Sequence, residues 1–361
     1  MKSNVWNMDL SPGKHKRSWW WWFWLFFIDN PENPNQPKQL AVMWSTKDCN
    51  KFKINDMWWY RQKETQRSGK EIIIDGAVGA WYYDGKNMIE PVVLAQSLFK
   101  ILEKENQGSL ISIPKPNYYL SGRPGDHKVH LENKNFNFHV DMSSTRDPLS
   151  TEKFSQNSFY FGYGFDILKI RRMNLHGSVR IGNKEEEIKG TGYFQKVRIS
   201  APIIPSWYWG TIHAHDGSYL QYYMLHLGPP MFRRKNSQSS PLDWGERYIS
   251  KSISFYSKEL KRHFEFKHPK ITKHFNKKGL PVFEMKGEAG GFRISYTLNS
   301  YSRATWYFEQ PMLGFIKTLL YYNEYPVTIS KFLLEGKGTR ITERNLKGGV
   351  GNCEHAWGCL I

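Results

Sequence analysis

The sequence predicts an all-β protein of two domains, and three observations lead to this prediction. Aromatic residues make up 16% of the 361 residues, and aromatic side chains are enriched in strands. The chain also contains 29 Gly and 18 Pro, the residue types that form turns. Finally, apolar runs of strand length follow one another, each bounded by Gly, Asn, Asp or Pro, as in a β-sandwich or β-barrel.

The length of the chain predicts how these strands are divided. At 361 residues it is longer than most single domains. The same pattern of strands and turns resumes after Pro205. We therefore expect an N-terminal β domain over residues 1–200 and a C-terminal β domain over residues 201–361.

The first expected element is the run Trp19–Ile28, "WWWWFWLFFI". It is about half as long as the roughly 20 residues that a membrane-spanning helix needs, and no small-residue cleavage site follows it. We interpret it as a strand that is covered on both faces. The alternative is an interfacial membrane anchor, because Trp and flanking cations favour the level of the lipid head groups.

One element differs from the strands that surround it. The segment Pro91–Asn106, "PVVLAQSLFKILEKEN", has Pro at its start and apolar residues at helical spacing, which predicts a short helix inserted in the first domain. Strands are expected on either side of it and throughout the second domain. The expected strands lie at 39–45, 70–85, 136–142, 158–170, 176–182, 187–199, 206–215, 218–226, 247–257, 292–300 and 305–310.

Charge and cysteine content limit the partners and the compartment. Lys and Arg number 51 against 33 Asp and Glu, a net charge of +18, which favours anionic partners such as nucleic acid or acidic lipid head groups. Three cysteines, Cys49, Cys353 and Cys359, are too few for a disulfide framework and fit a reducing compartment. We expect a cytoplasmic protein and leave peripheral contact with an anionic membrane open.

No metal or cofactor is expected. Cys353, His355 and Cys359 could ligate a metal ion, but the sequence offers no fourth ligand at a convincing spacing. The glycine-rich "GKG" and "GGVG" segments near the C-terminus lack the context of a phosphate-binding loop.

The basic segment Lys261–Lys278, "KRHFEFKHPKITKHFNKK", contains Phe264, Phe266 and Phe275 between its cations. Three interpretations remain open. Cations and rings together can hold single-stranded nucleic acid, or they can dock on an anionic membrane. The third is a solvated basic hairpin without a partner.

Aromatic residues, histidines and an acid concentrate between Gly190 and His226. Residues two apart in a strand share a side, so Trp207 and Trp209 should face one way. They could fill a core or line a cavity. The "DG" of Asp216 and Gly217 predicts a hairpin turn.

His213 and His215 are also two apart, and we expect them to share a face. They could bind a metal with a third ligand, act as general acid and base near neutral pH, or simply make hydrogen bonds on a solvated strand face. Glu324 and Glu343 lie among apolar strands and are candidate buried acids, although a solvated strand edge explains them equally well. His226 lies near the end of the tyrosine-rich strand.

Three stretches resemble a known family. They are the Trp-rich opening Ser18–Trp24, the segment "GTGYFQKV…PSWYWGTIHAHDGSYLQYYML" and the closing "YYNEYPVTISKFLLEGKGTRITERNLKGG". Their order and spacing resemble the lipocalin-like proteins that include carotenoid 1,2-hydratase (hydroxyneurosporene synthase) and the AttH-like proteins, with tocopherol cyclase as a more distant relative.

The resemblance implies two lipocalin-like β-barrel domains, an aromatic-lined cavity and a lipophilic, often isoprenoid, ligand. It also implies cofactor-independent acid catalysis, in which an alkene is protonated and then hydrated, cyclised or isomerised. The candidate catalytic residues are His213, His215, Glu324 and Glu343. The candidate ligand-binding residues are Tyr193, Trp207, Trp209, Tyr222, Tyr223 and His226.

The chain departs from the family at one point. Active hydratases carry an Asp-His-x-Trp-Gly type stretch where this chain has Gln195, Lys196, Val197 and Arg198, and an acid is expected near Tyr222. Two further functions therefore stay open: a non-catalytic lipid carrier or sensor, and a basic nucleic-acid-binding protein.

Overall fold

The computed structural model describes residues 5–15, 18–104, 107–158, 164–200, 206–227, 247–313 and 316–360. The chain forms two compact units. Unit 1 consists of Met1–Glu32, Lys38–Phe52 and Met57–Pro202, and unit 2 of Asn33–Pro37, Lys53–Asp56 and Ile203–Ile361. The division into independent domains over residues 1–200 and 201–361 stays a prediction.

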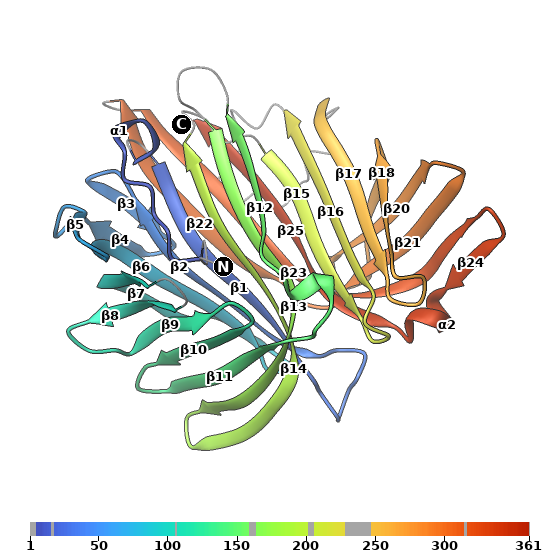
Figure 1. Ribbon diagram of the computed structural model, residues 1–361, viewed down its shortest axis with the longest axis horizontal. Helices are drawn as coiled ribbons and strands as arrows, with labels where there is room; N and C mark the ends of the chain where they lie inside the picture. Colours follow the sequence, from blue (N-terminus) through green and yellow to red (C-terminus); the bar gives the residue numbers. More distant parts are fainter. Residues whose placement is uncertain are drawn as a thin grey trace. The chain divides into compact units, whose positions relative to one another are not determined.

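Unit 1 is an antiparallel β-barrel (Figure 1). Its ten barrel strands run in the order β11-β10-β9-β8-β7-β6-β2-β1-β14-β13, and pairing of β11 with β13 closes the ring. Closure removes the free edges that an open sheet would expose. The barrel strands are β1 Ser18–Ile28, β2 Lys38–Lys47, β6 Glu71–Tyr83, β7 Met88–Glu103, β8 Gly108–Ile113, β9 Tyr118–Arg123, β10 Asp126–Glu132, β11 Phe136–Ser144, β13 Gly164–Ile181 and β14 Lys184–Ser200.

Shorter elements of the N-terminal half accompany the barrel. β5 pairs with β6, and β12 pairs with β13. These elements are α1 Pro12–His15, β3 Lys51–Ile54, β4 Met57–Tyr60, β5 Gln66–Ser68, the 3₁₀ turn Pro148–Ser150 and β12 Lys153–Ser158.

The Trp-rich run is a central strand of this barrel. β1 pairs with β14 on one edge and with β2 on the other, and all but one of its residues are buried. The prediction of a strand covered on both faces is confirmed. Because both edges are hydrogen-bonded and both faces are covered, the alternative of an interfacial membrane anchor is wrong.

The predicted helix over Pro91–Asn106 is wrong. Residues 91–103 belong to the long strand β7, which pairs with β6 and β8. The buried residues Val93, Phe99 and Ile101 are an even number of positions apart, which is the strand period. Pro91 lies where the pairing of β6 and β7 shifts register between Ala80 and Tyr82, a place where its missing N–H breaks no ladder hydrogen bond.

Unit 2 is built on a second antiparallel sheet, with strand order β18-β17-β16-β15-β25-β23-β21-β20-β19. β22 and β24 pair with β23, and Lys53 and Ile54 of β3 pair with β22. Its elements are β15 Ser206–Ala214, β16 Tyr219–Leu227, β17 Arg247–Ser257, β18 Arg262–Lys267, β19 Lys270–Phe275, β20 Pro281–Ala289, β21 Phe292–Ser300, β22 Ala304–Leu313, β23 Ile316–Gly336, β24 Thr339–Thr342, α2 Glu343–Leu346 and β25 Gly349–Leu360.

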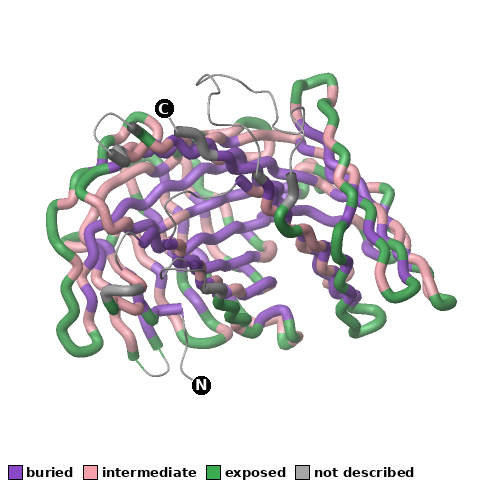
Figure 2. The backbone as a smooth tube through the Cα atoms, turned by 90° about the horizontal axis from the view of Figure 1, so that it is seen from above, coloured by how far each residue is buried: buried purple, intermediate pink, exposed green. Residues whose placement is uncertain are grey.

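Each unit has a core of its own. In unit 1 the core includes Trp20, Trp22 and Trp24 of β1, and in unit 2 it includes Tyr208, Phe255 and Phe283. Figure 2 shows buried residues along the middles of the strands and exposed residues at the turns. The all-β prediction, with β-barrel architecture, is confirmed. Among the described residues no helix is long and apolar enough to span a membrane.

Candidate functional site: a buried carboxyl pair in unit 2

Three adjacent strands of unit 2, β15, β25 and β23, bring two acids together. Glu354 of β25 lies between Trp209 of β15 and Glu324 of β23, each being its direct partner in the strand register. Residues directly opposite one another in antiparallel strands project from the same face of the sheet. Glu324, Glu354 and Trp209 therefore share one face, and Tyr223 joins them as the partner of Trp209 in β16.

Both acids are buried, with exposures of 0% for Glu324 and 3% for Glu354. Nδ2 of Asn352 donates a hydrogen bond to Oε2 of Glu324, and Nε1 of Trp207 donates one to Oε1 of Glu354. The second oxygen of each carboxyl, Oε1 of Glu324 and Oε2 of Glu354, has no hydrogen-bond partner among the described residues. The hydroxyl of Tyr322 is a further polar group that interacts with both carboxyls.

The environment favours the protonated form of both acids. Burial raises the pKa of Glu354 to about 7, while hydrogen bonds from Tyr322 and Trp207 act in the opposite direction. Burial, followed by repulsion from Glu354, raises the pKa of Glu324 well above its ordinary value. Two carboxyls so close to one another titrate as a pair, and at neutral pH the pair retains a proton.

Aromatic rings surround this pair. The rings of Trp207 and Tyr322 meet edge to face, with centroids 5.8 Å apart and planes at 69°. Burial and the charge of Glu354 raise the pKa of the hydroxyls of Tyr322 and Tyr223, which keeps both neutral. The faces of such rings attract cations.

The opposite face of the same strands carries other predicted residues. Tyr208 stacks on His355 at 4.0 Å between ring centroids, and its ring lies 5.2 Å from that of His226. Burial lowers the pKa of His226 to about 4, so its imidazole is neutral at physiological pH. Tyr222 belongs to the unit 2 core on this face. The structure therefore separates Tyr222 and His226 from Trp207, Trp209, Tyr223 and Glu324.

The two histidines predicted to share a face do not do so. His213 is buried in β15, with its ring 5.8 Å from that of Tyr219. β15 ends at Ala214, so His215 lies in the following turn, where it is exposed and its Nδ1 lies 2.9 Å from the carbonyl oxygen of Lys347. The turn itself was predicted correctly: Ser218 N donates to Oδ1 of Asp216 at 2.9 Å.

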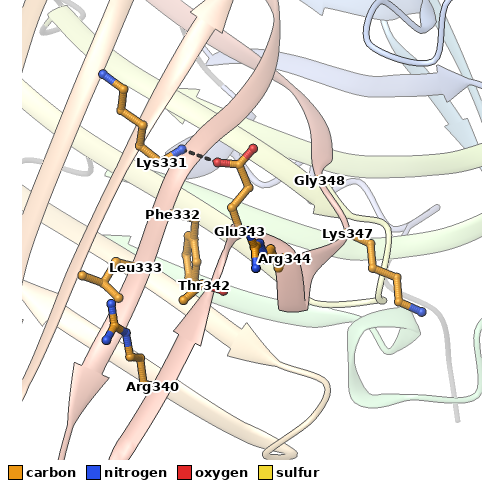
Figure 3. Close-up of a pocket in the computed structure, with 9 residues that line it drawn as sticks. All are labelled: Lys331, Phe332, Leu333, Arg340, Thr342, Glu343, Arg344, Lys347 and Gly348. Atoms are coloured by element: carbon orange, nitrogen blue, oxygen red, sulfur yellow. Dashed lines mark hydrogen bonds between the residues drawn. The ribbon is translucent and has the colours of Figure 1, made fainter.

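Glu343 is exposed, and the expectation that it is a buried acid is wrong. It is the first residue of α2, and its Oε2 accepts a hydrogen bond of 2.6 Å from the backbone N–H of Lys331. It lines an open pocket of about 780 Å³ (Figure 3), whose other lining residues include Lys331, Arg340, Arg344 and Lys347. In Figure 3 the amines of Lys331 and Lys347 point away from one another. These two positive charges therefore do not converge on one point in the pocket.

Tyr193 belongs to unit 1, where it is buried in β14 and its hydroxyl donates to Oε1 of Gln195 at 3.0 Å. The role in ligand binding that was predicted for Tyr193 stays a prediction.

The three phenylalanine rings of the basic segment Lys261–Lys278 do not form one exposed surface. Phe264 and Phe266 are buried in the unit 2 core, whereas Phe275 is 51% exposed. β18 pairs with β17, and β19 pairs with β20, so the two basic strands lie at the two ends of the sheet order. Because Phe264 and Phe266 are buried, stacking of bases on all three rings is not available.

Sequence reasoning missed Glu354, Asn352 and Tyr322. Glu354 lies between Cys353 and His355, two residues that the sequence indicates only as candidate metal ligands. No group of three metal-ligating side chains occurs within the part of the chain that the structure describes. The available signal was the single acid of the strand-like run Gly349–Leu360.

Comparisons with known proteins give the following picture. No protein-family model and no curated protein matches the sequence. Among solved structures, an AttH protein of Nitrosomonas europaea is similar over 94% of this chain and 92% of its own, with 11% identity and a TM-score of 0.49. Kievitone hydratase of Nectria haematococca is similar over 99% and 95%, with 11% identity and a TM-score of 0.42. CghA in complex with Sch210972 is similar over 94% and 88%, with 9% identity and a TM-score of 0.48. Identities and scores this low do not show a family.

Proposed function

We propose that unit 2 binds a lipophilic, isoprenoid-type molecule and transfers a proton to it from the Glu324–Glu354 pair, so that the protein hydrates, cyclises or isomerises its ligand. The observation that supports this most directly is the pair itself. Two buried carboxyls lie opposite one another on adjacent strands, each with one oxygen that has no described partner.

The chemistry needs both members of the pair. A protonated carboxyl donates its proton to one carbon of a C=C bond, which leaves a carbocation on the other carbon. Water can then add to this cation and return a proton to the second carboxylate, which gives net hydration. Without water, loss of a proton from a neighbouring carbon to the carboxylate gives an isomer. Attack by a second C=C bond closes a ring and moves the cation to the far carbon of that bond, where loss of a proton to the carboxylate ends the reaction.

The surroundings suit the charge that develops. Each ring face attracts a cation by roughly 0.5–2 kcal/mol, and Trp207, Trp209, Tyr223 and Tyr322 are the rings nearest in register. A buried acid that is protonated near pH 7 matches the requirement of a general acid. The proposal includes no cofactor.

The experiment has two steps. The protein is purified from a lipid-rich expression host and extracted with organic solvent, and the extract is analysed by mass spectrometry. A molecule found at one equivalent is then offered to wild-type protein and to the variants Glu324→Gln and Glu354→Gln. Glu284→Gln is the matched control, because Glu284 is a half-buried acid in β20 of the same unit.

We expect turnover by wild-type and Glu284→Gln protein, with a loss of about 10²-fold or more in both pair variants. Stoichiometric binding without turnover by the wild type would instead indicate a carrier or sensor. Full turnover by Glu324→Gln and Glu354→Gln would show that the acid lies elsewhere.

A further inference from the structure

The short strand β4 of unit 1 carries two exposed aromatic rings, here called the platform. Trp58 is 37% exposed and Tyr60 is 55% exposed. They are two residues apart in the strand, so their side chains project from the same face. Their ring centroids lie 6.1 Å apart, with the planes at 31° to one another. Single exposed apolar side chains are ordinary, but neighbouring ones mark a surface that meets a ligand or a partner.

The opposite face of β4 is buried, which gives the platform a firm base. Trp59, the residue between the two exposed rings, is 0% exposed, and its ring lies 4.7 Å from that of the buried Phe52 in β3. A large buried ring fixes the rotation of the strand about its own axis. The rings on the other face are therefore held toward solvent.

The pairing of β3 with β4 adds a cation to the exposed face. The two strands are neighbours joined by two residues, and the N–H of Arg61 donates a hydrogen bond of 2.9 Å to the carbonyl of Asn50. This antiparallel register places Lys51 opposite Tyr60. Lys51 is exposed, and its Nζ lies 5.7 Å from the ring centroid of Trp58. One face of the hairpin thus presents two rings and an amine.

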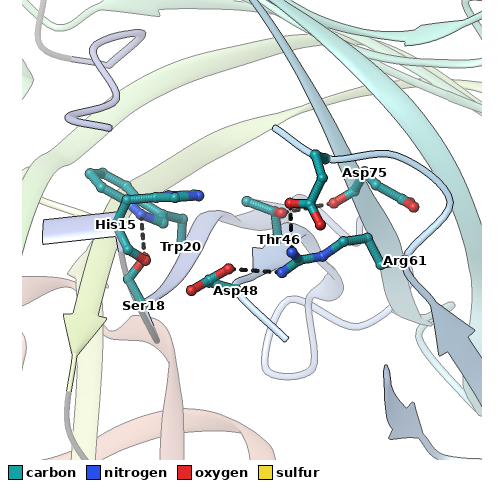
Figure 4. Close-up of polar contacts among 8 residues, drawn as sticks. His15, Ser18, Trp20, Thr46, Asp48, Arg61 and Asp75 are labelled. Atoms are coloured by element: carbon teal, nitrogen blue, oxygen red, sulfur yellow. Dashed lines mark hydrogen bonds and ion pairs between the residues drawn. The ribbon is translucent and has the colours of Figure 1, made fainter. Parts of the chain in front are cut away.

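The other edge of β4 is also held. Gln96 of β7 donates from Nε2 to the carbonyl of Tyr60 at 2.6 Å and to Oδ1 of Asp75 at 3.1 Å. Immediately after β4, Nη2 of Arg61 forms an ion pair of 2.8 Å with Asp48, which Figure 4 shows together with Asp75. Because the strand is bonded along both edges, the platform is organised before any ligand arrives.

The charge around the platform is positive. Residues 47–63 contain five Lys or Arg and two Asp, in a chain with a net charge of +18. Arg61 is neutralised by its ion pair with Asp48. Lys51 and Lys63 are exposed, and neither forms an ion pair with a residue that the structure describes. These two amines are available to an anion.

We propose that the platform binds single-stranded nucleic acid, with bases stacked on Trp58 and Tyr60 and phosphates on Lys51 and Lys63. Exposed aromatic rings stack on bases of any sequence, and lysines attract the phosphates between them. In a duplex the neighbouring base pairs cover the faces of each base, so a single strand is the matching partner. This site lies in unit 1 and does not depend on the function proposed for unit 2.

The contrast with the basic segment Lys261–Lys278 supports this choice. That segment has more cations, but two of its three rings are buried. The platform has fewer cations and exposes both of its rings. A neutral ligand such as a glycan would leave the two amines unused.

The test measures binding of a fluorescein-labelled twelve-nucleotide oligothymidylate by the full chain, from the anisotropy of the label between 50 and 300 mM KCl. A duplex of the same length and vesicles of phosphatidylserine and phosphatidylcholine are tested alongside. The variants are Trp58→Ala, Tyr60→Ala and Lys51→Met. The matched controls are Phe154→Ala, because Phe154 is a 52% exposed ring of the same unit, and Lys86→Met, because Lys86 is an exposed lysine of that unit.

We expect the single strand to bind more tightly than the duplex. Trp58→Ala and Tyr60→Ala should each weaken binding of the single strand by about fivefold or more, because a stacked base is lost, while Phe154→Ala retains it. Lys51→Met should lower the slope of log affinity against log salt concentration by about 0.7, the value for one phosphate contact on a single strand. Lys86→Met should leave the slope unchanged.

Several results would overturn the proposal. Equal losses in Lys86→Met and Phe154→Ala would show that the net charge of the chain holds the strand. Equal affinity for strand and duplex, or wild-type affinity in both ring variants, would contradict stacking on the platform. Vesicle binding that needs Trp58 and Tyr60, without a matching effect on the oligonucleotide, would make the platform a membrane contact. If Trp58→Ala does not fold, Tyr60→Leu, which keeps an apolar side chain without a ring, decides.

Discussion

At the scale of single residues, Glu324 and Glu354 are the least expected feature of unit 2. A buried carboxylate is costly unless it is paired or hydrogen-bonded, and two that face one another repel when both are charged. The fold tolerates them because the pair holds a proton and because Asn352 and Trp207 each donate to one oxygen. An arrangement that costs stability and leaves one oxygen of each acid without a described partner is typical of a functional site.

This pair should make stability depend on pH in a defined direction. The pKa of Glu354 is raised from 4.5 to about 7 in the folded chain, so between these values the folded state holds a proton that the unfolded state has lost. The free energy of unfolding should therefore fall as pH rises through this window, by up to about 1.4 kcal/mol per pH unit. Urea unfolding at pH 5, 6, 7 and 8 measures this slope.

His127 and His226 have lowered pKa values and therefore contribute a slope of the opposite sign at lower pH. The variant Glu354→Gln keeps both histidines and serves as the comparison. The difference in unfolding free energy between wild type and variant removes the contribution of the histidines and reports the carboxyl pair, since Glu354→Gln also removes the repulsion that raises the pKa of Glu324. A difference that does not change with pH, or that moves in favour of the wild type as pH rises, would contradict the assignment.

Trp207 should act on the same acid through one hydrogen bond. Trp207→Phe keeps an aromatic ring but removes the Nε1 donor to Glu354. We expect the loss to destabilise the chain by about 1–2 kcal/mol at pH 8, where Glu354 is charged, and by less at pH 5. Equal destabilisation at both pH values, measured by urea unfolding, would mean that the donor does not act on the charged carboxylate.

At the scale of elements, β1 and β7 show what the sequence can and cannot predict. Trp19–Ile28 could be predicted as a strand, because the run is only about ten residues long and is built almost entirely of aromatic side chains, which are enriched in strands. Pro91–Asn106 could not, because its apolar residues also fit a helical period and Pro91 is a favourable start for a helix. Pairing with β6 and β8, which lie outside the segment, decided the outcome.

Only part of the candidate site could be predicted, because the pairing of strands that are distant in the sequence decides which side chains meet. Glu324 and Trp207 were found because an acid and an indole in apolar strands are conspicuous. Glu354 was missed, because only the register of β25 between β15 and β23 places it opposite Glu324. Lys196 and Arg198 were seen as a departure from a family motif, and only the closed barrel shows that they face its interior.

The strand assignment of β7 can be tested by two neighbouring substitutions. Ile101 is fully buried and Leu102 is only partly buried, whereas a helix would have buried Leu102. Ile101→Ala should cost about 2–5 kcal/mol of unfolding free energy, and Leu102→Ala, the matched control, clearly less. The reverse order in urea unfolding would favour the helix.

At the scale of the whole molecule, two separate cores predict two unfolding transitions. The core around Trp20, Trp22 and Trp24 lies entirely in unit 1, and the core around Tyr208 and Phe283 lies entirely in unit 2. Because each unit buries its own apolar surface, each has its own source of stability. Ile101→Ala should lower the midpoint of one transition in differential scanning calorimetry, and Phe283→Ala that of the other. A single transition that both variants shift equally would mean that residues 1–200 and 201–361 fold as one cooperative unit.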